Sequence, residues 1–216
     1  MLAPNRDNRA GCMEERRRVN RISAVVLAGG RSSRLKTDKA FLKVKGQPLM
    51  ERIIDTLRQL SEEIIIVANE VDKYEELEAT VVSDAYPGQG SLGGIFTGVK
   101  VASNPHALVV ACDMPFLNVS LLRHMQSVAP SYDVVMPRIG RLTEALHAIY
   151  SKNCLPLMDQ QLQKGDLRIV HFLPHVRVRY VEKEEIEVFD PEHLSFFNIN
   201  TEADLERARE IWSQPD

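Results

Sequence analysis

The sequence predicts an α/β domain with a mostly parallel sheet and helices on both of its faces. Short runs of almost entirely apolar residues alternate with segments of helical periodicity from residue 22 to about residue 137. Such runs are typical of parallel strands, which are buried on both faces. Polar residues follow most of these runs directly, as expected where strands end at a ligand-binding edge.

The first half predicts strands at 22–28, 63–68, 81–82 and 107–112. Between them, Pro48 opens a helix whose apolar residues recur from Leu49 to Leu60, and 93–102 forms a second helix. Asn118 then caps a helix that carries Leu121, Leu122 and Met125. These elements give the strand–helix–strand order of a doubly covered sheet.

The second half is less regular. Strands are predicted at 143–150, 176–181 and 196–199, with a helix through Leu155 and Leu162. Thr201 and Asp204 form a variant of a capping box before a last helix that carries Trp212. We expect residues 22–216 to form one domain.

Composition narrows the class of protein. The 216 residues carry a net charge of -3, which does not favour nucleic acid or an anionic membrane as a partner. No apolar run approaches the ~18–20 residues needed to span a bilayer. Three cysteines without a C-x-x-C pair indicate reduced thiols in a cytoplasmic protein. Residues 1–21, with six arginines against three acids, read as a mobile, dispensable leader.

The most informative segment follows the first strand. Gly29 and Gly30 let a phosphate approach the backbone, whose N–H groups then point at it. Four cations come next, at Arg31, Arg34, Lys36 and Lys39. The spacing does not match a Walker P-loop. The segment therefore predicts a polyphosphate site of another kind.

Three acidic or amide side chains come directly after strands: Asn69, Asp84 and Asp113. The carboxyl ends of parallel strands meet at one edge of a sheet, so these side chains should lie near the phosphate loop. A bound triphosphate needs Mg²⁺, which one or two carboxylates hold together with the phosphates themselves. Asp113 is the predicted Mg²⁺ ligand, although a turn or cap residue would give the same local pattern.

Two further patterns leave alternatives open. Residues 88–93 match the G-x-G-x-x-G fingerprint of dinucleotide-binding proteins, with Asp113 20 residues beyond, but only a short strand precedes them. A flexible glycine loop over a base or substrate is the preferred interpretation. In the second half, Asn198 and Asn200 share one face of the predicted last strand, and His147 lies on an alternating strand. Each of the three could contact a ligand or serve packing alone.

Several motifs together resemble those of the molybdenum cofactor guanylyltransferases, a MobA-type nucleotidyltransferase family. They are LAGGRSSR at 27–34 with Asp38-Lys39, GQPL at 46–49, the glycines at 88–94, CDMPFL at 112–117, LHA at 146–148 and FNINT at 197–201. The resemblance covers about residues 22–212. It implies a Rossmann-like, three-layer nucleotidyltransferase fold. It also implies Mg²⁺-dependent transfer of GMP from GTP to molybdopterin-bound molybdenum cofactor, releasing pyrophosphate.

By position, the resemblance implies that Leu27, Ala28, Gly29, Asn69 and Asp84 contact GTP. It implies that Lys39 meets the phosphates and that Asp113 binds Mg²⁺. With Arg34, these last two would carry the catalysis, while His147, Asn198 and Asn200 would face the acceptor. Molybdoenzymes or cofactor-delivery proteins are the implied partners.

The chain departs from the family pattern at Lys36, where a glycine is usual, and at Ser91, where a proline is common. The alternatives are a cytidylyl or sugar-phosphate nucleotidyltransferase, a nicotinamide-dependent oxidoreductase, and a nucleotide-binding protein without activity. Gly29 stands where cytidylyl relatives tend to have alanine, which favours guanine.

Overall fold

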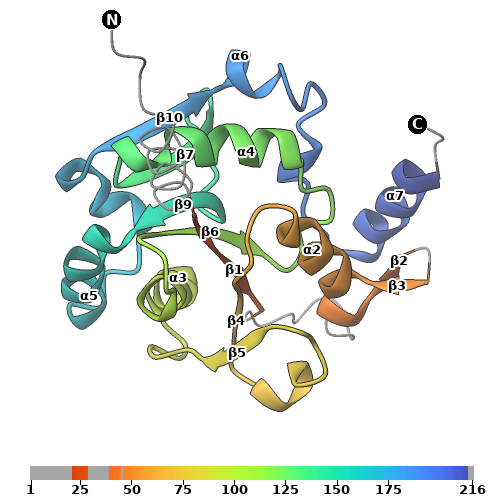
Figure 1. The fold of residues 1–216 in the computed structure, drawn as a ribbon. Coiled ribbons are helices and arrows are strands. Elements are labelled where there is room, and N and C mark those ends of the chain that lie inside the picture. Colours follow the sequence, from red (N-terminus) through yellow and green to blue (C-terminus); the bar gives the residue numbers. More distant parts are fainter. Residues whose placement is uncertain (1–20, 29–38, 45, 214–216) are drawn as a thin grey trace, which may run out of the picture.

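An eight-stranded β-sheet forms the centre of the molecule (Figure 1). Seven of its strands lie side by side, and the eighth forms a hairpin with one of them. The computed structural model describes residues 21–28, 39–44 and 46–213, so the predicted leader before Arg21 and the phosphate loop at 29–38 lie outside it. The strand order is β5-β4-β1-β6-β9-β7-β10, and β8 pairs with β7. The strands are β1 (Ser23–Leu27), β4 (Ile64–Ala68), β5 (Thr80–Ser83), β6 (His106–Ala111), β7 (Val134–Ile139), β8 (Leu142–Thr143), β9 (His147–Ser151) and β10 (Val178–Glu182), with β2 (Lys43–Val44) and β3 (Gln47–Pro48) in a separate pair.

The sheet is mostly parallel, as predicted. Strand β1 pairs in parallel with β4 and β6, β5 with β4, and β10 with β7. Strand β9 is the exception, because it lies antiparallel between β6 and β7. Its first residue, His147, is therefore opposite Val110 near the end of β6. The start of β9 thus lies at the same edge of the sheet as the ends of the parallel strands.

Helices cover both faces of this sheet and make three layers (Figure 1). Apolar residues of α2, α4 and α7 pack on one face, and those of α3 and α5 pack on the other. Burial on both faces explains why the strands are nearly all apolar. The helices are α2 (Leu49–Arg58), α3 (Gly90–Val101), α4 (Val119–Val128), α5 (Leu155–Gln163), α6 (Lys183–Ile186) and α7 (Glu202–Ser213).

Local chemistry fixes the helix starts that the sequence predicted. The Asn118 side chain accepts a hydrogen bond from the Leu121 amide at 3.0 Å, which caps α4. Thr201 and Asp204 cap α7 reciprocally, since each accepts a hydrogen bond from the backbone amide of the other. Pro48 precedes α2 directly, one residue outside the position predicted for it.

Two predicted strands are wrong in part or entirely. The strand expected at 143–150 is interrupted by a turn at 144–146, because Thr143 belongs to the β7–β8 hairpin and β9 begins only at His147. The strand expected at 196–199 is absent. Phe196 ends a 3-10 turn there, and the main-chain contact to the sheet edge is one hydrogen bond from the Ile199 amide to the Asp113 carbonyl, 2.9 Å long.

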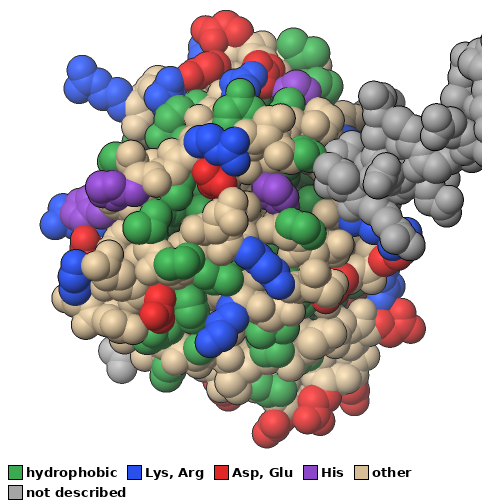
Figure 2. Space-filling model, turned by 60° about the vertical axis from the view of Figure 1, so that its left-hand side comes forward, with side chains coloured by type: hydrophobic (Ala, Val, Ile, Leu, Met, Phe, Trp, Pro, Cys, Tyr) green, Lys and Arg blue, Asp and Glu red, His purple; other side chains and the backbone are tan. Residues whose placement is uncertain are grey.

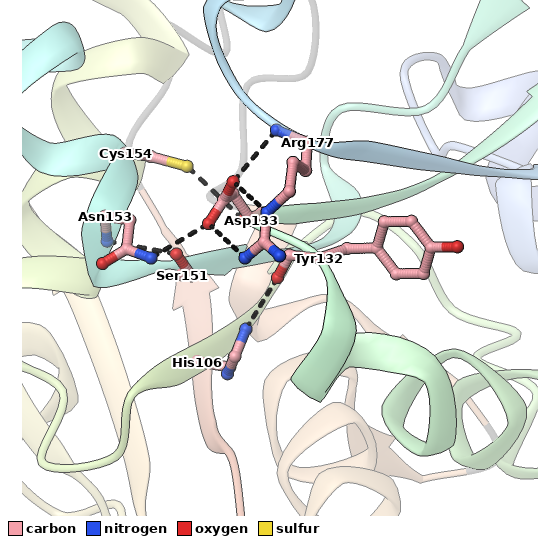
Figure 3. A network of polar contacts seen from close by, with 7 residues as sticks. All are labelled: His106, Tyr132, Asp133, Ser151, Asn153, Cys154 and Arg177. Carbon is pink, nitrogen blue, oxygen red and sulfur yellow. Dashed lines mark hydrogen bonds and ion pairs between the residues drawn. The ribbon is translucent and has the colours of Figure 1, made fainter.

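A polar network joins three strands at the opposite, amino edge of the sheet (Figure 3). The Asp133 carboxylate, directly before β7, accepts hydrogen bonds from the Asn153 side chain at 2.9 Å and the Arg177 amide at 2.9 Å. The Arg177 guanidinium binds it as well, at 3.2 Å. The Asp133 carbonyl accepts from the Ser151 amide at 2.7 Å. We call this set, with Cys154, the Asp133 network.

One face of the surface and two of the three cysteines can be described. On the face that Figure 2 shows, Lys and Arg side chains lie among acidic and apolar ones instead of gathering in one patch. No helix among the described residues is both long and apolar enough to cross a membrane. Within the same residues, Cys112 and Cys154 are not joined in a disulfide.

Candidate active site

The ends of the parallel strands bring most of the predicted site residues to one edge of the sheet. The Ala28 amide donates to the Val67 carbonyl at 2.9 Å, and the Cys112 amide donates to the Leu27 carbonyl at 3.1 Å. The end of β1 is therefore fixed between β4 and β6. Leu27, Ala28, Asn69, Asp84 and Asp113 all lie at or just beyond this carboxyl edge, as predicted.

Asp84 is held in place by α3. Its carboxylate oxygen accepts hydrogen bonds from the Thr97 hydroxyl at 2.9 Å and from the Tyr86 amide at 3.0 Å. The Tyr86 hydroxyl donates to Asp159 on α5 at 2.5 Å. The 84–89 loop is thus tied to both helices on its face of the sheet. A nucleotide contact by Asp84 would use a carboxylate whose direction is already set.

The glycines at 88–94 have two structural roles. Gly88 and Gly90 have φ angles of +79° and +64°, which disfavour side chains. An ideal Cβ on Gly93 would lie 2.9 Å from the Tyr86 carbonyl oxygen, and one on Gly94 would lie 3.2 Å from Leu27. From Gly90 onward these residues are helical, so the flexible loop is shorter than predicted. The glycines let the start of α3 approach β1 and the 84–89 loop closely, at the carboxyl edge.

Asp113 lies against the segment that contains Asn198 and Asn200. Besides the Ile199 hydrogen bond to Asp113, the rings of Phe116 and Phe197 meet edge to face at 5.7 Å. The Asn198 side chain donates to the Phe196 carbonyl at 3.0 Å. The structure therefore brings these residues together, but without the strand geometry that predicted a shared face for the two asparagines.

His147 is fully buried beside the same segment. Its ring meets the Phe196 ring edge to face at 5.1 Å, and neither ring nitrogen has a hydrogen-bond partner in the described part of the chain. Burial disfavours the charged imidazolium and lowers the pKa of His147 to about 4, although the nearby Asp190 opposes this shift. His147 is accordingly a neutral ring at pH 7.

Glu144 is a charged residue at this edge that was not predicted. Glu144 lies in the turn before β9, is half-buried, and has a raised pKa because burial disfavours its carboxylate. Burial of a turn residue depends on tertiary packing, so the residue types around it give no signal in the sequence.

The structure describes only some of the residues that were predicted to bind phosphate and Mg²⁺. Arg34, Gly29 and Gly30 lie outside the described residues, as does the side chain of Lys39. The described residues contain no group of three or more His, Cys, Asp and Glu side chains that could hold a metal ion. Asp113, just after β6, offers one carboxylate, which suits an Mg²⁺ ion whose other ligands are phosphates and water.

The fold has three layers, with a mostly parallel sheet between helices. A glycine-rich helix start and acidic residues lie at the carboxyl edge of the sheet. Together these features define a Rossmann-like nucleotidyltransferase domain. Comparison with known proteins gives the particular family. The chain belongs to the family of the MobA-like NTP transferase domain, whose model matches residues 24–178.

Its relatives match over nearly their whole lengths. A probable molybdenum cofactor guanylyltransferase of Pelotomaculum thermopropionicum is 37% identical over 187 residues, which cover 87% of this chain and 91% of the relative. The molybdenum cofactor guanylyltransferase of Desulfosudis oleivorans is 32% identical, covering 88% and 95%. The crystal structure of molybdopterin-guanine dinucleotide biosynthesis protein A from Archaeoglobus fulgidus superposes with a TM-score of 0.77 at 29% identity, covering 89% of this chain and 99% of that one.

Proposed function

We propose that this chain transfers GMP from GTP to molybdopterin-bound molybdenum cofactor and so forms the guanine dinucleotide cofactor. An oxygen of the acceptor's terminal phosphate attacks the α-phosphorus of GTP. A new P–O bond forms, the bond between the α- and β-phosphates breaks, and pyrophosphate leaves. The proposal depends above all on the relatives named as guanylyltransferases, which match over 87–88% of the chain.

In this proposal GTP binds where β1 ends. Leu27 and Ala28 would contact the nucleotide, with Gly29 and Gly30 next to them in the chain. Asn69 and Asp84 would contact it from the far side of β1, where β4 and β5 end. The Asp84 carboxylate is suited to this role because Thr97 and the Tyr86 amide already orient it.

The reaction needs positive charge near the phosphates more than it needs a general base. A terminal phosphate is already anionic at neutral pH, so no proton has to be removed before it attacks. The barriers are repulsion between two anions and the charge that develops on pyrophosphate. Preorganised cations reduce both, and positioning with electrostatics supplies almost all the catalysis of phosphoryl transfer. Arg34 and Lys39 are the proposed cations.

Mg²⁺ is the proposed cofactor, and Asp113 is its proposed protein ligand. A bound Mg²⁺ would neutralise phosphate charge. The Asp113 backbone is fixed on both sides, since the Cys112 amide binds β1 and the Asp113 carbonyl accepts from Ile199. The carboxylate therefore starts from a defined position beside the end of β1.

The acceptor would bind on the other side of Asp113, above β6 and β9. Asn198 and Asn200 lie there in the chain segment that contacts Asp113. His147, being fully buried and neutral, would support the acceptor site by packing and not as a cation. Molybdoenzymes or cofactor-delivery proteins in the cytoplasm are the proposed recipients of the product.

The test is pyrophosphate release by the purified chain with acceptor and each of GTP, CTP, ATP and UTP, with Mg²⁺ and with excess chelator. We expect release with GTP, in the presence of Mg²⁺ and acceptor together. Release with CTP at the same rate as with GTP would contradict guanylyl transfer. Thermal-shift measurements with NAD serve as the control for the oxidoreductase alternative, since a ligand at 100 times its Kd adds about 2.7 kcal/mol of stability.

A further inference from the structure

The turn at 144–146 holds Glu144 rigidly at the carboxyl edge. The Glu144 amide donates to the Pro137 carbonyl on β7 at 3.1 Å, and the Glu144 carbonyl accepts from the His147 amide at 3.1 Å. The Tyr150 hydroxyl donates to the Ala145 carbonyl at 2.8 Å. The turn is therefore fixed to the strand before it and the strand after it, which fixes the backbone of Glu144.

The Glu144 carboxylate has no compensating charge partner in the part of the chain that the structure describes. It is half-buried, yet it makes no ion pair or side-chain hydrogen bond within the described residues. Other partly buried acids there have partners: Glu185 binds His124 and Arg179, and Asp133 binds Arg177. Burial also acts to raise the pKa of Glu63, Asp133 and Glu185, but hydrogen bonds outweigh it there and lower each pKa, whereas the pKa of Glu144 is raised overall. A partly buried charge without a partner is costly and is most common where a ligand supplies the partner.

Glu144 lies on the side of Asp113 where the acceptor is proposed to bind. Neighbouring strands lie about 4.8 Å apart. Glu144 lies between β8 and β9 in the chain, its amide is bound to β7, and β9 is next to β6. Glu144 is thus one or two strands from Asp113. Asn69 and Asp84 lie in the other direction, beyond β1. The buried His147 ring, whose nitrogens have no partner among the described residues, is three residues from Glu144.

We propose that Glu144 binds the 2-amino-4-oxopyrimidine edge of the acceptor's pterin ring, a role that rests on the proposed function. This edge presents a ring N–H and an amino N–H side by side. The two oxygens of a carboxylate accept both, as in a bidentate pair with arginine. Guanine carries the same edge, so GTP is the other source of this chemistry. The place of Glu144 on the β7–β9 side assigns it to the acceptor.

The first test compares two fluorescent ring compounds, pterin and lumazine, by titration against the protein without nucleotide. Lumazine has an oxygen in place of the amino group. That oxygen would be repelled by the Glu144 carboxylate, whereas the amino group of pterin would donate a hydrogen bond to it. We expect the wild type to bind pterin at least tenfold more tightly and Glu144→Gln to lose that preference. Glu184→Gln, an exposed glutamate on α6, is the matched control and should keep it.

Two results would overturn the proposal: a wild type that binds both rings equally, or a Glu144→Gln variant that keeps the wild-type preference. The variant should fold, because the charge that it removes is paired with no described residue, and its loss should not cost stability. An unchanged or higher melting temperature than the wild type checks this.

The second test separates pterin from guanine. Affinities for GTP and for inosine triphosphate, which lacks the amino group, are measured in the wild type and in Glu144→Gln. We expect the same ratio in both proteins. A ratio that falls only in the variant would assign Glu144 to guanine and overturn the proposal. Pyrophosphate release by the wild type decides the proposed function separately, since the pterin titration needs no nucleotide.

Discussion

Replacing Asp133 with asparagine should destabilise the fold by about 2 kcal/mol at pH 7. Hydrogen bonds from Arg177 and Asn153 lower the pKa of Asp133 from 3.8 to about 2. Each pKa unit is worth about 1.4 kcal/mol, so a shift of nearly two units corresponds to roughly 2 kcal/mol. Asp133 is itself buried, which limits screening of its interactions by solvent.

The lowered pKa of Asp133 also predicts how the stability difference between wild type and variant changes with pH. A carboxyl whose pKa is lower in the folded state stabilises the fold above its unfolded pKa, and this contribution is lost as pH falls through the folded value. The stability difference between wild type and Asp133→Asn should therefore be constant from pH 8 to about pH 5. It should shrink between about pH 4 and pH 2.

Urea unfolding, followed by circular dichroism at several pH values, measures this difference. Asp72→Asn is the control, since Asp72 is exposed and lies outside the network. Arg177→Gln should cost less than Asp133→Asn, because its side chain is 67% exposed and the Asn153 bond remains. A difference below about 0.5 kcal/mol at pH 7, or one that does not shrink in acid, would refute the reasoning. GTP affinity should not change, because the network lies at the opposite edge from the site.

Five further changes test the site, its supporting helix and the leader. Asp113→Asn should abolish Mg²⁺-dependent pyrophosphate release while the melting temperature is kept; full activity would remove the metal assignment. Lys39→Ala should lower turnover by roughly 10²-fold, and more than it weakens GTP binding, if Lys39 stabilises transition-state charge. Gly98→Ala should destabilise by about 2–3 kcal/mol, because its Cβ would lie 2.3 Å from the Val25 side chain on β1. Gly94→Ala should cost under about 1 kcal/mol, since the flexible end of a leucine can move; equal costs in thermal melts would contradict this packing. A chain that begins at Val19 should keep its melting temperature and GTP affinity, and a loss of several degrees would show that the leader packs on the domain.

The elements that the sequence predicted well are those set by local chemistry. Buried parallel strands are recognisable because both of their faces must be apolar, and the Asn118 and Thr201 caps act within four residues. The meeting of Asn69, Asp84 and Asp113 at one edge follows from strand direction alone. These features need no knowledge of distant contacts.

The parts that could not be predicted depend on distant contacts. Nothing local indicates that β9 lies antiparallel between β6 and β7, which is what places His147 at the site edge. The segment around Asn198 has strand-like composition, but its hydrogen bond to Asp113 and the Phe116–Phe197 contact hold it in another conformation. The half-burial of Glu144 likewise arises only once β7 and β9 are in place.

The position of β9 also affects how the chain is completed during translation. Strand β7 leaves the ribosome before β9, yet it reaches the sheet only through β9. Until residue 151 has emerged, β6 has an unpaired edge, because its residues from His106 to Val110 pair with β9 on that side. An unpaired apolar edge pairs readily with other chains. Truncated products that end before β9 should therefore aggregate more than those that end after it, in which β6 has a strand on each side.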